Sequence, residues 1–301
     1  MIEIAQSAGV AAMGLLEAPW SAAVLHFLQV ELPQSSGELL SHLRLLIVGV
    51  GLVVGFLVGM TGVGGGSLLT PALIVLGVRP TVAVGTDLLY GSITKLAGTH
   101  QHWRQGGIQW NWVFYLALGS VPASVLATWV IHYFRQHYGS ADNLVRLGLG
   151  VVLVLAALAT FLNDFYKRRR PETAALSAPV DPKAHRLKVI LLGAGVGFLV
   201  GLTSVGSGAL IAVALLALSR LPSVQIVGTD IAHALVLVSA AATAHLQIGT
   251  VDIPLAANLL IGSLPGVILG SKLAYYTPDR PLKVGMALLV LASGLKMIRV
   301  F

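Results

Sequence analysis

Residues 55–73 read GFLVGMTGVGGGSLLTPAL, and residues 197–215 read GFLVGLTSVGSGALIAVAL. Aligned at a shift of 142 residues, 12 of these 19 positions are identical, which indicates an internal repeat. Each copy is a glycine cluster inside strongly apolar sequence, and glycine permits non-helical turns and close backbone approach. A duplicated, interrupted apolar segment of this kind is typical of the central binding site of a membrane transporter.

The composition of the whole chain also indicates a membrane protein. Of its 301 residues, 56% are hydrophobic and only 10% are charged, too few charges to solvate the surface of a soluble domain of this size. Apolar runs near the roughly 20 residues that a helix needs to cross a bilayer recur along the chain. We therefore predict an all-α polytopic membrane protein with about seven to ten helical elements that cross or enter the bilayer. The chain has no cysteine, which excludes disulfides and thiolate sites, and we expect no cofactor and no metal.

The repeat continues beyond the glycine clusters and divides the chain. At a shift of 143 residues, Gly85-Thr86-Asp87 returns as Gly228-Thr229-Asp230, His102 as His245, and Gly119-Ser120-Val-Pro122 as Gly262-Ser263-Leu-Pro265. We expect four parts: an N-terminal segment (1–43) that forms an interfacial helix or, as the less favoured alternative, an extra span, a first transmembrane repeat (44–163), a basic cytoplasmic linker (164–187) and a second transmembrane repeat (188–301). The linker's basic residues fit a cytoplasmic loop near anionic lipid better than a nucleic-acid site.

Each half is expected to hold five helical pieces. They cover residues 45–60, 67–76, 82–99, 110–133 and 144–162 in the first half, and 187–202, 209–218, 224–246, 253–274 and 282–297 in the second. The first two pieces of a half would reach about 48 Å as one straight helix, so the glycines must break them. If the broken element is re-entrant, each half has three membrane crossings and the two copies are inverted. If it crosses the membrane, each half has four crossings and the two copies are parallel. Positive residues in the linker and at Lys296 and Arg299 favour a cytoplasmic location for the linker and for the C-terminus. An even number of crossings would then separate the two, which favours parallel copies.

Several ionisable residues lie in these apolar helices and are candidates for coupling or for lining the pathway. Asp87 and Asp230 occupy equivalent positions, where they either line a pathway or cap and pack their helices. Lys95 has no charged counterpart in the second copy, and it pairs with Asp87, binds an anion or snorkels. His102 and His245 either relay protons or cap helix ends.

The glycine clusters themselves are the candidate substrate site. They offer backbone N–H groups and the positive ends of the short helices that follow, which attract anions, and nearby hydroxyls add donors. Close helix packing is the alternative explanation for the pairs Gly55/Gly59 and Gly197/Gly201. The candidate substrate-binding residues are Thr61, Gly62, Gly64, Gly65, Gly66, Ser67, Thr203, Ser204, Gly206, Ser207 and Gly208.

Taken together, residues 45–299 resemble the sulfite exporter TauE/SafE family, through the two glycine blocks, Gly85-Thr86-Asp87 and the stretch from His102 to Gly106. The resemblance implies a small carrier of sulfur-containing anions, such as sulfite, sulfoacetate or other organosulfonates, in the bacterial inner membrane. The second copy departs from the first, since Ser204 and Ser207 replace Gly62 and Gly65. This difference puts equal roles for the two halves in doubt.

We therefore expect a secondary transporter, an exporter rather than an enzyme, that binds a small-molecule anion between the two glycine breaks. Protons, carried by the aspartates or histidines, are the expected coupling ion. The lipid bilayer is its other partner, and the oligomeric state stays open. The alternatives are a channel or uniporter for another small anion, a non-transporting scaffold and, more remotely, an intramembrane serine protease built on Ser207 and His245.

Overall fold

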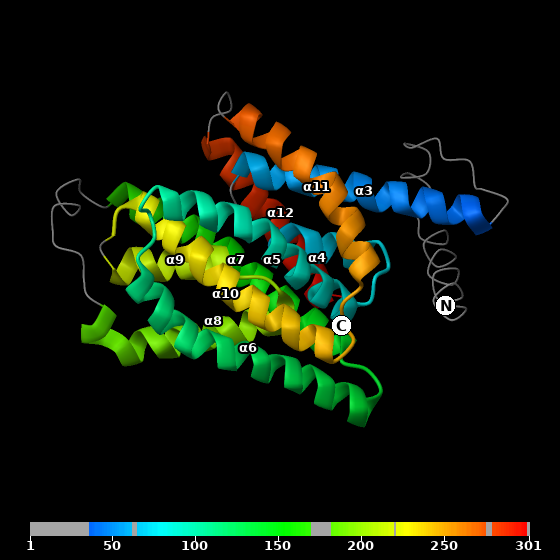
Figure 1. Cartoon of the computed structure of the whole chain (residues 1–301), viewed down its shortest axis with the longest axis horizontal. Coiled ribbons are helices and arrows are strands. Elements are labelled where there is room, and N and C mark those ends of the chain that lie inside the picture. The colour runs from blue at the N-terminus through cyan, green and yellow to red at the C-terminus, as the bar shows by residue number, and fades with distance from the viewer. Residues whose placement is uncertain (1–35, 62–64, 170–181, 220, 275–278, 300–301) are drawn as a thin grey trace.

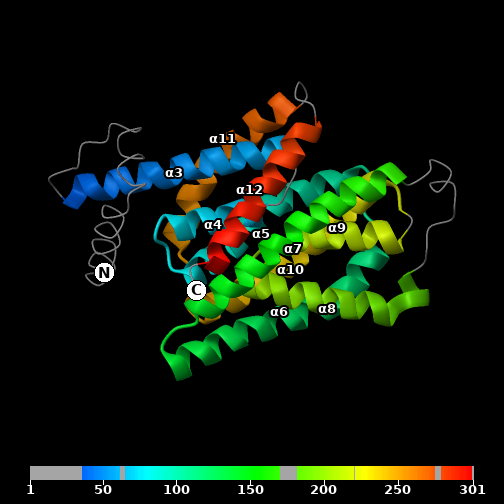
Figure 2. The same ribbon diagram turned by 180° about the vertical axis from the view of Figure 1, so that it is seen from behind.

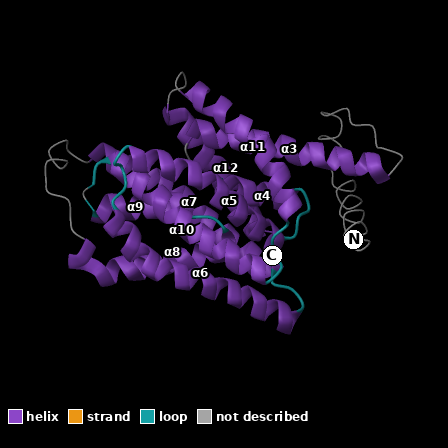
Figure 3. Ribbon diagram, in the orientation of Figure 1, coloured by secondary structure: helices purple, strands orange, loops and turns teal. Residues whose placement is uncertain are grey.

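The computed structural model describes residues 36–61, 65–169, 182–219, 221–274 and 279–299, and no strand occurs among them (Figure 3). They form ten α-helices and one short 3-10 helix, in this order: α3 (Ser36–Thr61), α4 (Gly66–Val75), α5 (Pro80–Arg104), α6 (Trp110–Tyr138), α7 (Asp142–Arg169), η2 (Pro182–His185), α8 (Arg186–Thr203), α9 (Ser207–Leu218), α10 (Ser223–Gln247), α11 (Ile253–Ala274) and α12 (Asp279–Arg299). The prediction of an all-α protein is confirmed. The greater part of the expected interfacial helix, half of the linker (170–181), and Gly62 and Gly64 lie outside the described residues.

The helices are built to face lipid. Five stretches of the described helices are long and apolar enough to cross a membrane: Trp110–Tyr138, Asp142–Leu162, Arg186–Thr203, Val224–Gln247 and Ile253–Leu273. On their outer faces, Leu126, Leu264 and Ile268 each expose more than half of their surface. Soluble monomers rarely expose large contiguous apolar patches, so this exterior fits a polytopic membrane protein.

The two sequence copies fold alike but run in opposite directions. The first copy gives α3 to α7 and the second gives α8 to α12. Gly85 lies against Thr250, whereas Gly98 lies against Ile231, so α5 and its counterpart α10 are antiparallel. The contact of Gly150 with Ile298, and of Gly294 with the Leu153 side chain, gives the same relation for α7 and α12, which lie side by side in Figures 1 and 2.

The glycine break turns the chain back on itself. Gly51 lies against Leu259 and Gly59 against Val267, so α3 runs beside α11 in the same direction. α4 and the start of α5 then return to the beginning of α11, where Thr86 accepts a hydrogen bond of 3.0 Å from the backbone N–H of Asp252. The first break is therefore re-entrant.

This geometry corrects one expectation. A re-entrant break leaves three following helices in each half, and an odd number makes the copies inverted. The antiparallel pairs α5/α10 and α7/α12 agree with that arrangement. The prediction of parallel copies, which the charges at Lys296 and Arg299 favoured, is wrong. Two terminal charges are weak evidence for orientation, and the turn at the glycine cluster reverses the chain.

The first helix of each copy packs against the other copy. α3 lies along α11, and α8 lies along α6. A Cβ built on Gly55 would overlap the backbone of Ser263, and one built on Gly197 would overlap the backbone of Ser120. Small residues let helix backbones approach this closely in membranes. The packing interpretation therefore explains these glycines, and the swapped contacts hold the two breaks near the molecular centre.

Candidate functional site

The two glycine breaks meet inside the molecule. α4 begins at Gly66 and α9 begins at Ser207, and a Cβ built on Gly66 would overlap the carbonyl oxygen of Ser204. Ser204 (φ 63°) and Gly206 (φ 111°) adopt left-handed backbone conformations, which are uncommon for a residue other than glycine. They turn the chain from the end of α8 directly into α9.

A pocket lies between the breaks. It offers about 50 Å³ to the centres of water-sized spheres, several times the roughly 10–15 Å³ that holds one water. Its walls also include apolar side chains of α7, α10 and α12. Its glycine and polar lining residues are Gly65, Gly66, Ser67, Asp87, Tyr90, Gly91, Thr94, Lys95, Thr160, Ser204, Gly206, Ser207 and Gly208. The space suits a small ion.

Both short helices present their N-terminal ends to this pocket. The first N–H groups of a helix have no acceptor within it, and no side-chain cap bonds to the start of α4 or α9. These ends also carry the positive pole of the helix dipole. Two such ends facing one space from inverted copies form a site that favours negative charge.

Asp87 joins the two breaks. It is 1% exposed, and its Oδ2 accepts hydrogen bonds from Thr70 Oγ1 at 2.5 Å and from Ser204 Oγ at 2.8 Å. Thr70 belongs to α4 and Ser204 to the break of the other copy. Asp87 therefore lines the pocket and connects side chains from the two breaks, and its place on a transport pathway stays a prediction.

Lys95 supplies the positive charge. It follows Asp87 by two helical turns, about 12 Å along α5, and its side chain reaches the pocket wall. It forms no salt bridge with a described residue, but it interacts electrostatically with Asp87 and Asp230. A lysine without a directly bonded carboxylate can bind an anion that enters the pocket.

Comparisons with known proteins agree with this architecture. The family model described as "Sulfite exporter TauE/SafE" matches residues 47–297. The chain belongs to the sulfite exporter TauE/SafE family. It is 49% identical over 253 residues, 84% of this chain and 98% of the relative, to the "Probable membrane transporter protein YjnA" of Bacillus subtilis. It is 26% identical to the "Probable membrane transporter protein YdhB" of the same organism, over 84% of this chain and all of the relative.

A more distant relative is archaeal. The "Probable membrane transporter protein MJ0441" of Methanocaldococcus jannaschii is 26% identical over 276 residues, 87% of this chain and 97% of that protein. No solved structure gives a significant match. Membership of the TauE/SafE family confirms the resemblance seen in the motifs, and it makes this chain a member of a membrane transporter family.

The repeated histidines of this TauE/SafE protein lie away from the pocket. His245 Nε2 lies 3.0 Å from the carbonyl oxygen of Gly201, and its Nδ1 lies 2.8 Å from Thr250 Oγ1. Since a carbonyl only accepts, Nε2 carries a hydrogen, and the Thr250 hydroxyl, which contacts Nδ1, also donates to the His245 carbonyl. His102, at the equivalent end of α5, packs against Gly228. Both histidines therefore fit helix-end positions better than a proton path.

The same bonds bear on the protease alternative. Both ring nitrogens of His245 are engaged by Gly201 and Thr250, so neither is paired with Ser207. Nucleophilic catalysis by serine needs a histidine nitrogen within hydrogen-bond reach. Among the described residues, no group of three or more His, Cys, Asp or Glu side chains could hold a metal ion. The geometry gives no support to either chemistry.

Some predicted residues lie elsewhere. Thr203 does not line the pocket; its hydroxyl donates to the carbonyl of Leu199 at 2.7 Å within α8. The side chain of Thr61 lies outside the described residues, as do Gly62 and Gly64. Asp230 is buried, at 8% exposure, beyond the pocket wall. Its Oδ1 finds no hydrogen-bond partner among the described residues.

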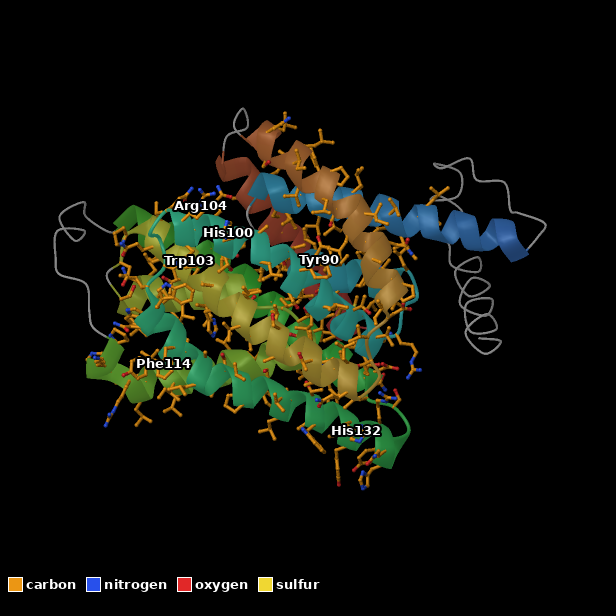
Figure 4. The ribbon with its side chains drawn as sticks, viewed as in Figure 1. Tyr90, His100, Trp103, Arg104, Phe114 and His132 are labelled. Carbon is orange, nitrogen blue, oxygen red and sulfur yellow. The ribbon has the colours of Figure 1, made fainter. Side chains whose placement is uncertain are left out.

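Sequence reasoning missed Tyr90 and Thr70. Tyr90, at the centre of the molecule in Figure 4, lines the pocket and bonds to Ser263. Its counterpart in the second copy is His233, whose Nε2 lies 2.9 Å from Ser120 Oγ. Ser120 and Ser263 belong to the repeated Gly-Ser-x-Pro motif. The repeat alignment was the available signal, because it places Tyr90 opposite His233 at one position.

Proposed function

We propose that this membrane transporter carries small sulfur-containing anions, such as sulfite, sulfoacetate or other organosulfonates, and exports them across the bacterial inner membrane. The observation that carries the proposal is the pocket between the N-terminal ends of α4 and α9, with Lys95 in its wall. The family description and the names of the relatives support the transporter class. Sulfur enters the proposal through the family.

The pocket has the donors that an oxyanion requires. The first-turn N–H groups of Gly66 and Gly208 have no acceptor within their helices, and the Ser207 hydroxyl lies in the wall. Hydrogen bonds with an ionised partner are roughly twice as strong as neutral ones. Lys95 contributes an amino group in the wall, which carries a positive charge when it is protonated. The anion would therefore be held by backbone and hydroxyl groups and neutralised by the lysine.

The inverted copies suggest how such a site opens to each side in turn. Each short helix belongs to a different copy, and rocking of one copy against the other would open the pocket first to one face and then to the other. The re-entrant pieces α4 and α9 are the elements that would move, because their first turns form the pocket and only short breaks connect them to α3 and α8.

The direct experiment is a binding and flux screen with purified protein. Sulfite, thiosulfate, sulfoacetate, taurine and sulfate are each tested by thermal shift and by uptake of the labelled anion into proteoliposomes. We expect saturable flux of at least one sulfur oxyanion. Replacing Lys95 by Gln should weaken its binding at least tenfold, the effect of losing a charged partner worth about 1.5–3 kcal/mol.

A matched control separates this effect from a general loss of charge. Lys272 lies on α11 and is exposed, so Lys272→Gln should leave binding and flux unchanged. No binding of any of the five compounds, or equal loss in both variants, would contradict the proposal. Flux that does not saturate would instead indicate a channel.

A further inference from the structure

The two repeated aspartates have unequal surroundings. Asp87 accepts hydrogen bonds from Thr70 and Ser204. In the sequence alignment of the copies, the positions equivalent to Thr70 and Ser204 are Ala212 and Gly62. Neither carries a hydroxyl. Asp230 therefore keeps the acid of the repeat but has neither of the hydroxyl donors that serve Asp87.

Asp230 shows the consequence. It is 92% buried, and its Oδ1 finds no donor among the described residues. A buried ionised carboxylate without donors is expensive, whereas a protonated carboxyl is not. One turn further along α10, the Nδ1 atom of His233 is also buried, and it has no hydrogen-bond partner among the described residues. Unpaired buried polar atoms of this kind are rare and call for an explanation.

Lys95 links Asp230 to the pocket. It is the charged group that acts on Asp230, and it also lines the pocket. Its counterpart in the second copy is Val238, so no second lysine serves the pocket from α10. One side chain therefore both interacts electrostatically with a buried acid and lines the place where an anion would bind.

The other ionisable groups around Asp230 do not duplicate this role. On α5, His102 packs against Gly228, two residues before Asp230. α9 carries no ionisable side chain, and Arg186 and Lys188 of α8 are exposed. On α6, Arg135 donates to the carbonyl of Ile248, about 27 Å along α10 from Asp230.

We propose that Asp230 binds a proton that travels with the anion, and that Lys95 couples the two. When Asp230 is ionised, it attracts the Lys95 ammonium and the pocket loses its positive charge. When a proton converts the carboxylate to the acid, the Lys95 ammonium interacts with the anion instead. Release of the anion on the far side returns Lys95 to Asp230, and the proton leaves to water there. This inference rests on the proposed function.

The coupling has a defined sign. Proton binding to Asp230 strengthens anion binding, and by reciprocity the anion strengthens proton binding. Anion affinity should therefore fall as the pH rises. Coupling between two sites in one protein is typically 5–150-fold in affinity, and we expect a change within that range for sulfoacetate between pH 5.5 and 8.

The test measures both fluxes in the same vesicles. Proteoliposomes contain a trapped pH-sensitive dye, and sulfoacetate or sulfite is added as the ³⁵S-labelled anion. In the wild type, anion entry should acidify the lumen with about one proton per anion. Asp230→Asn should still exchange labelled for unlabelled anion, but its proton signal should fall at least tenfold. Asp230→Glu, which keeps an acid, should retain the signal.

Asp87→Asn is the matched control, since it makes the same change in the other copy. It should lower flux, because it alters the pocket, yet keep the ratio of protons to anions. Proton movement with the anion in Asp230→Asn, or anion movement without protons in the wild type, overturns the inference and leaves the proposed function standing. If the wild type moves neither anion, the proposed function fails with it. Should Asp230→Asn not fold, pH-independent sulfoacetate affinity in the wild type overturns the inference.

Discussion

Gly66 is a point at which the two glycine breaks touch. Its Cα lies so close to the carbonyl oxygen of Ser204 that a Cβ would overlap it, and the same Cβ would lie 3.1 Å from Asp87 Oδ2. A side chain there must push apart the two breaks that form the pocket. Glycine is therefore required at position 66 because two backbone segments approach closely there. Gly206 is required for a different reason, since its φ of 111° turns the chain.

Gly66→Ala should consequently lower stability and damage the site together. Overpacking of this kind costs about 1–3 kcal/mol, and we expect a lower Tm and at least tenfold weaker anion binding. Gly195→Ala is the control, because a Cβ at Gly195 meets nothing within 4 Å. Thermal unfolding of the detergent-solubilised variants and the anion titration check both effects. Unchanged binding in Gly66→Ala would show that the two breaks do not shape the site.

Thr70 makes a second prediction at this scale. Its hydroxyl donates to a fully buried carboxyl, Asp87, and hydrogen bonds to charged groups contribute about 1.5–3 kcal/mol. Thr70→Val removes the donor at nearly constant volume, so we expect a drop in Tm and weaker anion binding. Thr243→Val removes an exposed hydroxyl that bonds only within its own helix and should change Tm little. Equal shifts of Tm in the two variants would contradict the idea that the Thr70–Asp87 hydrogen bond connects the two breaks.

The polar residues of the site differ in how well the sequence predicts them. Asp87 and Lys95 stand out because charge is costly in an apolar helix. Thr70 and Tyr90 do not, because hydroxyls and aromatic rings are ordinary in membrane helices and can bond to their own backbone. Only the fold brings Thr70 and Ser204 to one carboxyl. Long-range contacts of this kind leave no local pattern in the sequence.

At the scale of elements, the helices themselves were predictable. The apolar runs predicted ten pieces, and the described residues form ten α-helices whose limits differ from the prediction by several residues at some ends. The glycine clusters correctly marked the breaks. What the runs could not give is the direction of α4 after the break, because a hairpin and a straight discontinuous helix have the same composition. The partner of α3 was equally hidden, since packing on α11 depends on the whole fold.

The ends of α5 and α10 carry the element-scale prediction. His245 connects the end of α10 to Gly201 of α8 and to Thr250, so its role is to hold helices. Loss of two buried hydrogen bonds should cost about 1–3 kcal/mol. His245→Ala should therefore lower Tm, and the pH dependence of transport should keep its shape. His100→Ala, at an exposed position of α5, is the control. A pH profile that flattens in His245→Ala alone would restore this histidine to the proton path.

For the whole molecule, inverted copies place equivalent residues on opposite sides of one centre. The symmetric backbone then carries different side chains at equivalent positions. In the repeat alignment, Lys95 corresponds to Val238, Tyr90 to His233 and Thr70 to Ala212. Two identical halves would give two identical half-sites. The substitutions instead gather the donors on Asp87 and leave Asp230 without them, and the proposed proton coupling depends on this asymmetry.

The same inversion makes a prediction about topology. The contact of Gly150 with Ile298 places the end of α12 near the beginning of α7, about 30 Å from the end of α7 where the linker starts. That distance is close to the thickness of the hydrocarbon core, so the linker and the C-terminal end of α12 should lie on opposite sides of the membrane. The linker holds the denser cluster of basic residues, at Lys167–Arg170 and Lys183–Lys188, and should be cytoplasmic.

The absence of cysteine from the chain makes this prediction directly testable. A single cysteine at the exposed position of Arg186, at the start of α8, or of Arg299, at the end of α12, is treated in intact cells with a membrane-impermeant maleimide. Arg299→Cys should be labelled from outside, whereas Arg186→Cys should react only after the membrane is opened. Both variants are first labelled in detergent, which controls for reactivity. Parallel copies would put both positions on one side, so equal labelling of the two in intact cells would contradict the inverted arrangement and, with it, the convergence of α4 and α9 on one pocket from opposite faces.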